Sequence, residues 1–130
     1  MLFSLAIYGA PYSTQSSSSA YRFALAALQQ GHQIYRLFFY SDGVHNATGL
    51  SAPPQDEPNL PERWRALATE HKIDCVVCIA AALRRGLINE EEASRYGKPA
   101  NNLMPEFELS GLGQLVDAAV RSDRLITFGR

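Results

Sequence analysis

Apolar runs and helix-period segments alternate along the chain. Residues 2–8, 34–40 and 73–79 are apolar runs rich in β-branched and aromatic side chains, which favours β-strands. The first run is almost continuously apolar, as is typical of a strand covered on both faces. Residues 107–109 are predicted to form a short strand, and residues 124–128 form a final one.

Helix signals occupy the intervals between these strands. The serine run 16–19 supplies candidate N-caps for a first helix, and Gly31 stands where a C-cap glycine belongs. Pro61 suits the first turn of a second helix, where a backbone N–H is unpaired in any case. Helices are predicted around residues 21–28, 60–71, 80–85, 89–97 and 112–120. An apolar stripe marks the last of them, formed by Leu112, Leu115, Val116, Ala119 and Val120.

The order of these elements predicts the fold. Residues 44–59 contain three prolines and several polar side chains, which predicts a long surface loop with a short element inside. Strands that alternate with helices are typical of a parallel sheet with helices on both faces. The predicted fold class is therefore α/β, a three-layer sandwich of flavodoxin-like character with a mainly parallel sheet of about five strands flanked by helices. Because no repeat or linker interrupts it, the chain is predicted to be a single domain over residues 1–130.

Composition and charge narrow the functional classes. With a net charge of -1, the chain gives no reason to expect the clustered basic face that tight nucleic-acid binding requires. No apolar run is long enough to span a membrane, and the N-terminus lacks the features of a secretory signal. The chain has two cysteines, too few for a disulfide scaffold. These features predict a cytoplasmic protein.

The two cysteines, Cys75 and Cys78, form a C-x-x-C pattern, which suggests a thioredoxin-type redox pair. Both lie in a predicted strand, where residues three apart point to opposite faces. Their Cα atoms would be roughly 10 Å apart, whereas a disulfide requires less than about 7 Å. A redox pair is therefore not expected. A metal site is not expected either, because no second Cys/His pair completes a zinc set.

The two cysteines are therefore interpreted separately. A buried apolar thiol is the simplest interpretation for each, and it is kept for Cys75 in the middle of the strand. Cys78 lies near the C-terminal end of the strand, where sites form in open α/β sheets. A helical turn begins after it, and Arg84 and Arg85 add positive charge, which together favour a thiolate or an anionic persulfide. Solvated positions at a helix end are the alternative for the arginines.

Other candidate residues have simple structural alternatives. His45 follows the second strand and is a candidate general base, although a surface histidine in the loop is the simpler interpretation and is preferred. Residues 110–113 are expected to let a helix start close to the sheet, and their backbone is a candidate lining for the cysteine pocket. Residues 9–19 are rich in Gly, Ser and Thr but lack the glycine patterns of phosphate-binding loops, so nucleotide binding is a weak hypothesis.

Several segments closely resemble TusD and DsrE proteins, and the resemblance runs nearly end to end. Residues 77–86, Val-Cys-Ile-Ala-Ala-Ala-Leu-Arg-Arg-Gly, are similar to the active-cysteine segment of those proteins. The other matching segments are 38–40, 42–44, 53–57, 110–115 and 123–125. Together these segments are specific, and the chain resembles the DsrE-like family of sulfurtransferase subunits.

The resemblance implies a DsrE-like fold and a sulfurtransferase that carries sulfur as a persulfide on Cys78, without a metal or organic cofactor. It implies assembly with homologous TusB-like and TusC-like subunits into a heterohexamer. The implied sulfur donor is TusA-like, and the implied acceptor is TusE-like. The implied destination of the sulfur is the 2-thio group of the wobble uridine in tRNA. The alternative is a DsrE-type subunit of a dissimilatory sulfur-oxidation complex.

Two further hypotheses stay open. The first is a non-catalytic structural subunit of such an assembly, and the presence of Cys78 in its full motif argues against it. The second is a small-molecule or nucleotide-binding module with a flavodoxin-like fold. That hypothesis predicts binding of common nucleotides or flavins, and we expect none.

Overall fold

The structure is a computed structural model, and it describes residues 1–129. The strands are β1 (Leu2–Ile7), β2 (Gln33–Phe39), β3 (Asp74–Cys78), β4 (Glu108–Ser110) and β5 (Arg124–Phe128). The helices are α1 (Ser16–Gln29), α2 (Leu60–His71), α3 (Ile79–Arg84), α4 (Glu90–Arg95) and α5 (Gly113–Arg121). A 3-10 helix, η1 (Ser41–Ala47), follows β2.

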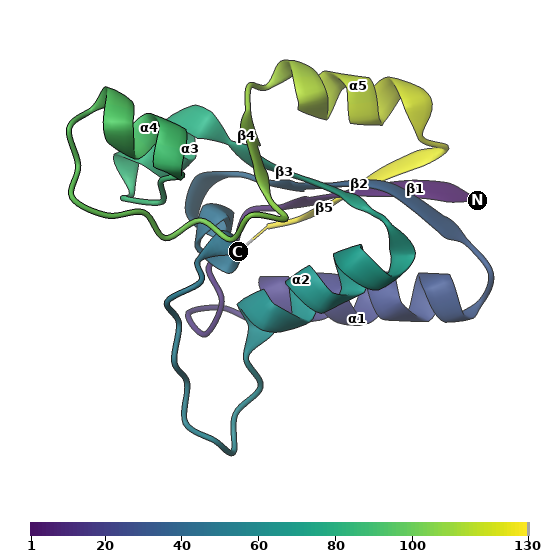
Figure 1. The fold of residues 1–130 in the computed structure, drawn as a ribbon. Coiled ribbons are helices and arrows are strands. Elements are labelled where there is room, and N and C mark those ends of the chain that lie inside the picture. The colour runs from purple at the N-terminus through teal and green to yellow at the C-terminus, as the bar shows by residue number, and fades with distance from the viewer. Residues whose placement is uncertain (130) are drawn as a thin grey trace.

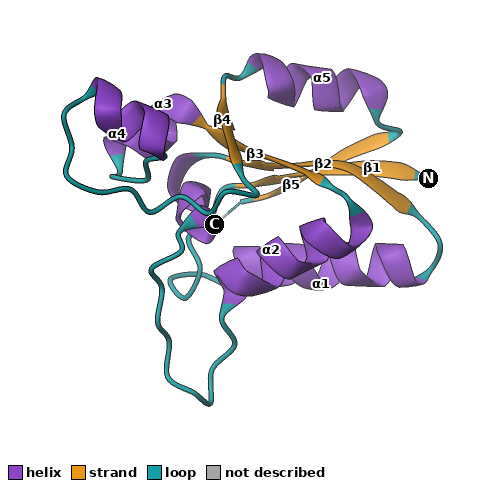
Figure 2. Cartoon of the chain, viewed as in Figure 1, coloured by secondary structure: helices purple, strands orange, loops and turns teal. Residues whose placement is uncertain are grey.

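These strands form one parallel sheet in the order β4-β3-β2-β1-β5. Figure 1 shows α1 and α2 below the sheet and α5 above it. The handedness of parallel crossovers explains the arrangement. From β1 to β3 the chain moves across the sheet in one direction, and from β4 to β5 it returns, so a right-handed connection puts α5 on the opposite face. The predicted α/β sandwich with a parallel sheet is confirmed (Figure 2).

Aromatic side chains fill the core between the sheet and the lower helices. Phe39 of β2 and Trp64 of α2 are fully buried and meet edge to face, with their ring centroids 5.5 Å apart. Phe38 is also fully buried, and adjacent residues of a strand point to opposite faces, so β2 is covered on both sides. Asn59 caps α2 by accepting a hydrogen bond from the backbone N–H of Glu62.

The start of α1 differs from the prediction. The expectation that the serine run supplies the N-cap is wrong, because α1 begins at Ser16 and its N-cap residue is Gln15, which makes no side-chain capping hydrogen bond. Ser17 is fully buried and donates instead to the carbonyl oxygen of Gly9. This hydrogen bond ties the loop after β1 to the helix, a tertiary role that local sequence does not reveal.

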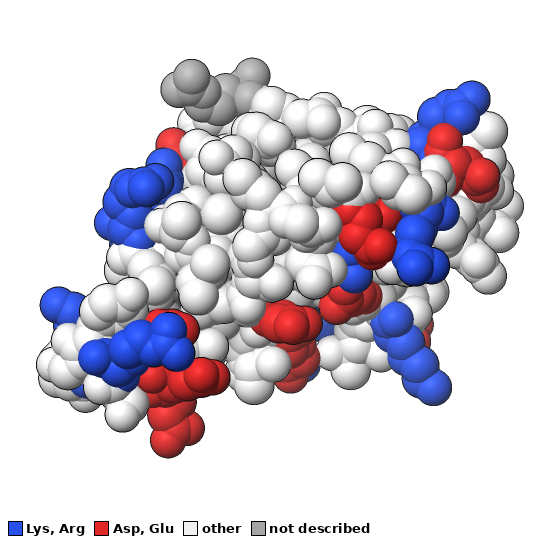
Figure 3. Space-filling model, turned by 90° about the horizontal axis from the view of Figure 1, so that it is seen from above, with Lys and Arg blue, Asp and Glu red and all other residues white. Residues whose placement is uncertain are grey.

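Helix α5 covers the upper face with little apolar packing. Ala118 is its buried residue, whereas Leu112, Val116 and Val120 are 48%, 63% and 78% exposed. The predicted apolar stripe therefore turns largely toward solvent. Figure 3 looks down on this side of the molecule and shows a broad surface without Lys, Arg, Asp or Glu.

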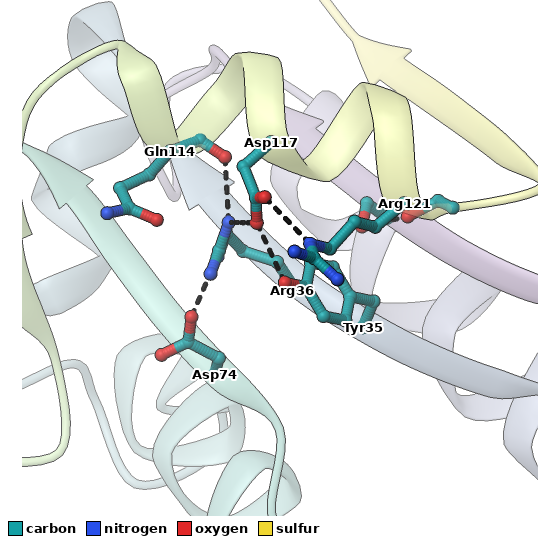
Figure 4. Close-up of polar contacts among 8 residues, drawn as sticks. Tyr35, Arg36, Asp74, Gln114, Asp117 and Arg121 are labelled. Carbon is teal, nitrogen blue, oxygen red and sulfur yellow. Dashed lines mark hydrogen bonds and ion pairs between the residues drawn. The ribbon is translucent and has the colours of Figure 1, made fainter.

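A polar network lies beneath α5 and joins it to the sheet (Figure 4). Arg36 of β2 has a side chain only 9% exposed, and it donates to Asp74 of β3 at 2.7 Å and to Asp117 of α5 at 2.9 Å. It also donates to the main-chain carbonyl oxygen of Gln114 at 2.8 Å. The hydrogen bond from Tyr35, followed by those from two arginine side chains, lowers the pKa of Asp117 to about 2. Ion pairs and hydrogen bonds thus fix the position of α5 on the sheet.

Candidate functional site

Both cysteines lie in β3, as predicted, and Cys78 is its last residue. Cys78 is also the N-cap residue of α3, which begins directly after it. In the parallel ladder Cys75 is level with Leu37 of β2, and Cys78 is level with Ser110 of β4. Both thiols are free. The strand geometry that argued against a redox pair is therefore present.

The side chains of both cysteines are nearly covered by protein. Cys75 is 2% exposed and Cys78 is 4% exposed. Burial, with a smaller contribution from the charge of Asp74, raises the pKa of Cys75 to about 12. Cys75 is therefore a protonated apolar thiol at neutral pH, and Cys78 remains the candidate nucleophile.

The two arginines at the end of α3 have different surroundings. Arg85 donates to Asp42 of η1 at 2.8 Å and to the carbonyl oxygen of Ala81 at 3.1 Å. Its charge is paired, and it links α3 to η1. Arg84 is exposed and forms no ion pair within residues 1–129. Because α3 has only six residues, its dipole adds little. Arg84 therefore fits the solvated position at a helix end, and Arg85 is neutralised in part by Asp42.

The predicted long loop after β2 begins inside η1, which packs beside α3 and β3. Val44 and Ala47 of η1 are fully buried, and so is Asn46 between them. The side-chain amide of Asn46 donates to Ser17 Oγ at 2.9 Å, and its oxygen accepts from Trp64 Nε1 at 3.1 Å. Sequence reasoning missed Asn46. The available signal was a pair of polar residues, His45 and Asn46, between Val44 and Ala47 in a segment that was predicted to be a surface loop.

The glycine of the 42–44 segment is required by a close backbone approach. A Cβ atom at Gly43 would lie 2.0 Å from the carbonyl oxygen of Ile7, which no side chain tolerates. Gly43 therefore lets η1 sit directly on the end of β1. This gives a physical reason for one of the segments that carry the family resemblance.

The remaining candidates lie at the same edge of the sheet, with less direct roles. Ser110 ends β4 opposite Cys78, so the segment 110–113 starts beside the cysteine, as the pocket-lining hypothesis requires. His45 is half-buried within η1. In the segment 9–19, whose last four residues belong to α1, the buried Ser17 hydroxyl is occupied by hydrogen bonds to Gly9 and Asn46, which favours a structural role.

The position of Cys78 agrees only in part with the general rule for α/β sites. The rule places sites beyond the carboxyl ends of the strands, where the strand order reverses. Cys78 lies at that edge. The order reverses at β1, which lies between β2 and β5, so β3 is two strands away from the reversal. The rule therefore predicts the edge of the sheet at which Cys78 lies, but it does not predict the strand.

The described residues offer neither a metal-binding cluster nor a helix that could span a membrane. Within residues 1–129, no group of three or more His, Cys, Asp or Glu side chains is placed to hold a metal ion. In the same range, no helix has both the length and the apolar character needed to cross a lipid bilayer.

A parallel five-stranded sheet with a cysteine at the end of a strand and a short helix directly after it defines an α/β protein with a candidate thiol site. The model of the DsrE/DsrF-like family matches residues 1–128. The chain belongs to that family, which confirms the resemblance seen in its segments.

Curated relatives match the chain over nearly its full length. A protein of Pseudomonas aeruginosa named sulfurtransferase TusD homolog is 54% identical over 129 residues, 99% of this chain and 98% of that one. The sulfurtransferase TusD of Serratia proteamaculans is 52% identical and covers 95% of this chain and 96% of its own. A protein of Allochromatium vinosum named for DsrE is 56% identical, with 99% of each chain covered. At the level of the family, these names confirm the predicted enzyme class, a sulfurtransferase.

Among solved structures, the ychN protein from E. coli is similar, with a TM-score of 0.76 at 22% sequence identity. The match covers 98% of this chain and 100% of that one. At this identity the likeness concerns the fold alone, and it agrees with the parallel sheet described above.

Proposed function

We propose that this protein is a sulfurtransferase subunit, a single DsrE-like domain over residues 1–130, that carries sulfur as a persulfide on Cys78. The single observation that carries the proposal is the placement of Cys78 at the end of β3, inside the segment that resembles the active-cysteine segment of the family. The TusD relatives, named as sulfurtransferases, support the reaction class. The burial of Cys75, which raises its pKa to about 12, supports Cys78 rather than Cys75 as the carrier.

The proposed reaction is two successive thiol exchanges. The Cys78 thiolate attacks the outer sulfur of a donor persulfide, so a sulfur–sulfur bond forms on Cys78 while the bond within the donor breaks. The donor cysteine leaves as a thiolate. An acceptor thiolate then attacks the outer sulfur on Cys78, and Cys78 leaves as a thiolate. These two exchange steps require no external oxidant or reductant and no cofactor.

Access to Cys78 is part of the proposal. Because the residue is 4% exposed, a partner cysteine reaches it only after α3 or η1 moves locally. The Arg85–Asp42 ion pair joins these two elements. We therefore propose that partner binding displaces this short-helix region, which also limits the reaction of the persulfide with small reductants.

The proposed destination of the sulfur is the wobble uridine of tRNA, by way of a TusA-like donor and a TusE-like acceptor, in the cytoplasm. Assembly with TusB-like and TusC-like subunits into a heterohexamer is proposed with it. The exposed apolar residues of α5 support such an assembly, because a subunit interface would cover them. The alternative is a DsrE-type subunit of sulfur oxidation. It is favoured by the DsrE-named relative, whose identity of 56% is close to that of the TusD relatives.

Intact-mass analysis tests the carrier residue. Incubation with a persulfide donor is expected to add about 32 Da, one sulfur atom, and Cys78→Ser is expected to abolish the addition. Cys75→Ser is the matched control and should load as the unmodified protein does. Loading that persists in Cys78→Ser would overturn the proposal.

The pathway is tested separately in cells. Deletion of the gene is expected to lower the 2-thiouridine content of tRNA, measured by mass spectrometry of digested nucleosides. The content should return with the unmodified gene and not with Cys78→Ser. An unchanged 2-thiouridine content together with impaired sulfur oxidation would favour the DsrE-type alternative.

A further inference from the structure

A second surface lies next to the candidate site, where α3 and α4 approach the loop that follows α4 (Figure 1). Two adjoining hollows of about 290 Å³ and 330 Å³ open there, and they share the lining residues Leu83, Ile88 and Lys98. We name their joint surface the α3–α4 groove. Leu50 and Arg84 line it as well, and so does Tyr96.

The groove combines apolar side chains with unpaired positive charge. Leu50 is 73% exposed and Tyr96 is 57% exposed, which is high for side chains of this size. Arg84 and Lys98 are exposed, and neither forms an ion pair in the described part of the chain. Of the described residues that line the groove, none is Asp or Glu. This surface is complementary to a segment that carries both apolar side chains and carboxylates.

The groove is held in shape by Asn102. Its side chain donates to the carbonyl oxygen of Gly86 and accepts from the backbone N–H of Ile88, both at 2.9 Å. Its own carbonyl oxygen accepts from the backbone N–H of Gly49 at 2.7 Å. Three separate segments are thus joined at one residue. A preformed surface loses little conformational freedom when a partner binds.

We propose that the α3–α4 groove binds an acidic, apolar segment of the protein that exchanges sulfur with Cys78. The inference rests on the proposed function, because it takes Cys78 as the residue that exchanges sulfur. Carboxylates of the segment pair with Arg84 and Lys98, and its apolar side chains cover Leu50 and Tyr96.

Helix α3 connects the groove directly to Cys78. Leu83 lies roughly 8 Å beyond Cys78 along the helix axis, at about 1.5 Å per residue. An extended chain advances by about 3.3 Å per residue. A partner cysteine a few residues from the bound segment therefore spans this distance. Binding in the groove raises the effective concentration of the partner thiol at Cys78.

The test uses synthetic peptides as probes. Cys78 is first converted to a mixed disulfide with thionitrobenzoate. A peptide thiolate then attacks the Cys78 sulfur, a new disulfide forms, and coloured thionitrobenzoate thiolate leaves. One peptide alternates Glu with Leu and ends in Cys, and a second has Lys in place of each Glu. The acidic peptide is expected to react about tenfold faster than the basic one.

Variants assign the preference to the groove. Arg84→Glu combined with Lys98→Glu is expected to remove or reverse the preference, and Leu50→Ser is expected to weaken the reaction of the acidic peptide. Arg22→Glu is the matched control, because Arg22 is an exposed arginine on α1, away from the groove, and it should leave the preference unchanged. Because these residues are exposed, the substitutions leave the core intact, and the variants are expected to fold.

The outcomes separate this inference from the proposed function. The proposed binding in the groove is overturned by equal rates for the two peptides, or by a preference that survives the double charge reversal. This holds even where a small persulfide donor still loads Cys78. A preference that depends on Arg84 and Lys98 supports the groove, including in a protein whose Cys78 fails to accept sulfur. That last combination contradicts the proposed function: the groove still selects acidic segments, but the protein that carries such a segment does not exchange sulfur with Cys78.

Discussion

The middle of β3 and its C-terminal end each hold a cysteine, and both side chains are nearly covered. Cys75 is level with Leu37 of the neighbouring strand, and its pKa is raised to about 12. Cys78 lies where the strand stops and a six-residue helix begins. Static exposure, 2% against 4%, hardly separates them. We expect the difference to lie in what must move to expose each thiol: the paired middle of β3 for Cys75, and the short segment at the end of the strand for Cys78.

The largest expected effect is on the rate of thiol alkylation. In the folded protein, iodoacetamide should modify Cys78 at least about 100-fold faster than Cys75, because local opening costs less free energy than global unfolding. Peptide mass spectrometry over a time course measures both rates in one sample. Low concentrations of urea should accelerate modification of Cys75 steeply and that of Cys78 only weakly, since only the first requires exposure of the core.

A matched pair controls this measurement. Cys75→Ala leaves Cys78 as the only thiol, and Cys78→Ala leaves only Cys75, so each rate is checked without its neighbour. Similar rates with the same urea dependence would mean that both thiols are exposed by one opening event, and the proposed distinction would not hold.

The raised pKa of Cys75 predicts that this residue makes the stability of the protein depend on pH in the alkaline range. Between its ordinary value of 9.0 and about 12, the unfolded chain loses this proton while the folded protein keeps it. The stabilising contribution is therefore complete below pH 9.0 and is lost as the pH rises toward 12. The free energy of unfolding should fall by up to about 1.4 kcal/mol per pH unit more than in Cys75→Ala, measured by urea denaturation.

Cys75→Ala is a suitable reference because it retains every tyrosine and lysine that titrates in the same range. Equal slopes for the two proteins would show that Cys75 ionises in the folded state as readily as in the unfolded chain. Its burial would then not determine its chemistry.

Serine substitution separates the two positions by their backbone surroundings. Cys75→Ser places a hydroxyl inside a paired strand, and we expect a loss of about 1–3 kcal/mol in the free energy of unfolding. At Cys78, the N-cap residue of α3, a serine oxygen can accept a hydrogen bond from the first turn, so the loss should stay below about 1 kcal/mol. Urea denaturation of the two variants gives both values. An equal loss would indicate that the end of β3 is as rigid as its middle.

The features that made this comparison possible were largely visible in the sequence. The segment 73–79 is mostly apolar and rich in β-branched residues, and for that reason a strand was predicted there with Cys78 near its end, where β3 lies. The end of α1 was predicted from Gly31, whose φ angle of +87° is one that glycine adopts without strain. Gly86 and Gly97 follow α3 and α4 in the same way, with φ angles of +78° and +65°.

The features that were missed depend on contacts between distant residues. Arg36 and Asp117 are separated by 81 positions, and nothing local shows that they pair beneath α5. The periodicity of α5 predicts an apolar stripe, but it does not show which side of the helix meets the sheet. The exposure of Val116 was therefore not foreseen. Arg85 was interpreted as added positive charge near Cys78 or as a solvated residue at a helix end, and its pairing with Asp42, 43 positions earlier, was not foreseen.

The smallest expected effect tests which cause dominates at Cys75. Burial is the larger cause of its raised pKa, and the charge of Asp74 is the smaller one. Asp74→Asn removes that charge, while the amide oxygen can still accept the hydrogen bond from Arg36 that the carboxylate accepts at 2.7 Å. The pKa of Cys75 should therefore fall only part of the way toward 9.0, and the alkaline loss of stability should end at a slightly lower pH. The reference is Asp74→Asn combined with Cys75→Ala, which carries the same altered network without the thiol. A return of the Cys75 pKa to its ordinary value would show that charge, rather than burial in the middle of β3, keeps this thiol protonated, and Asp74 would then be what distinguishes it from Cys78.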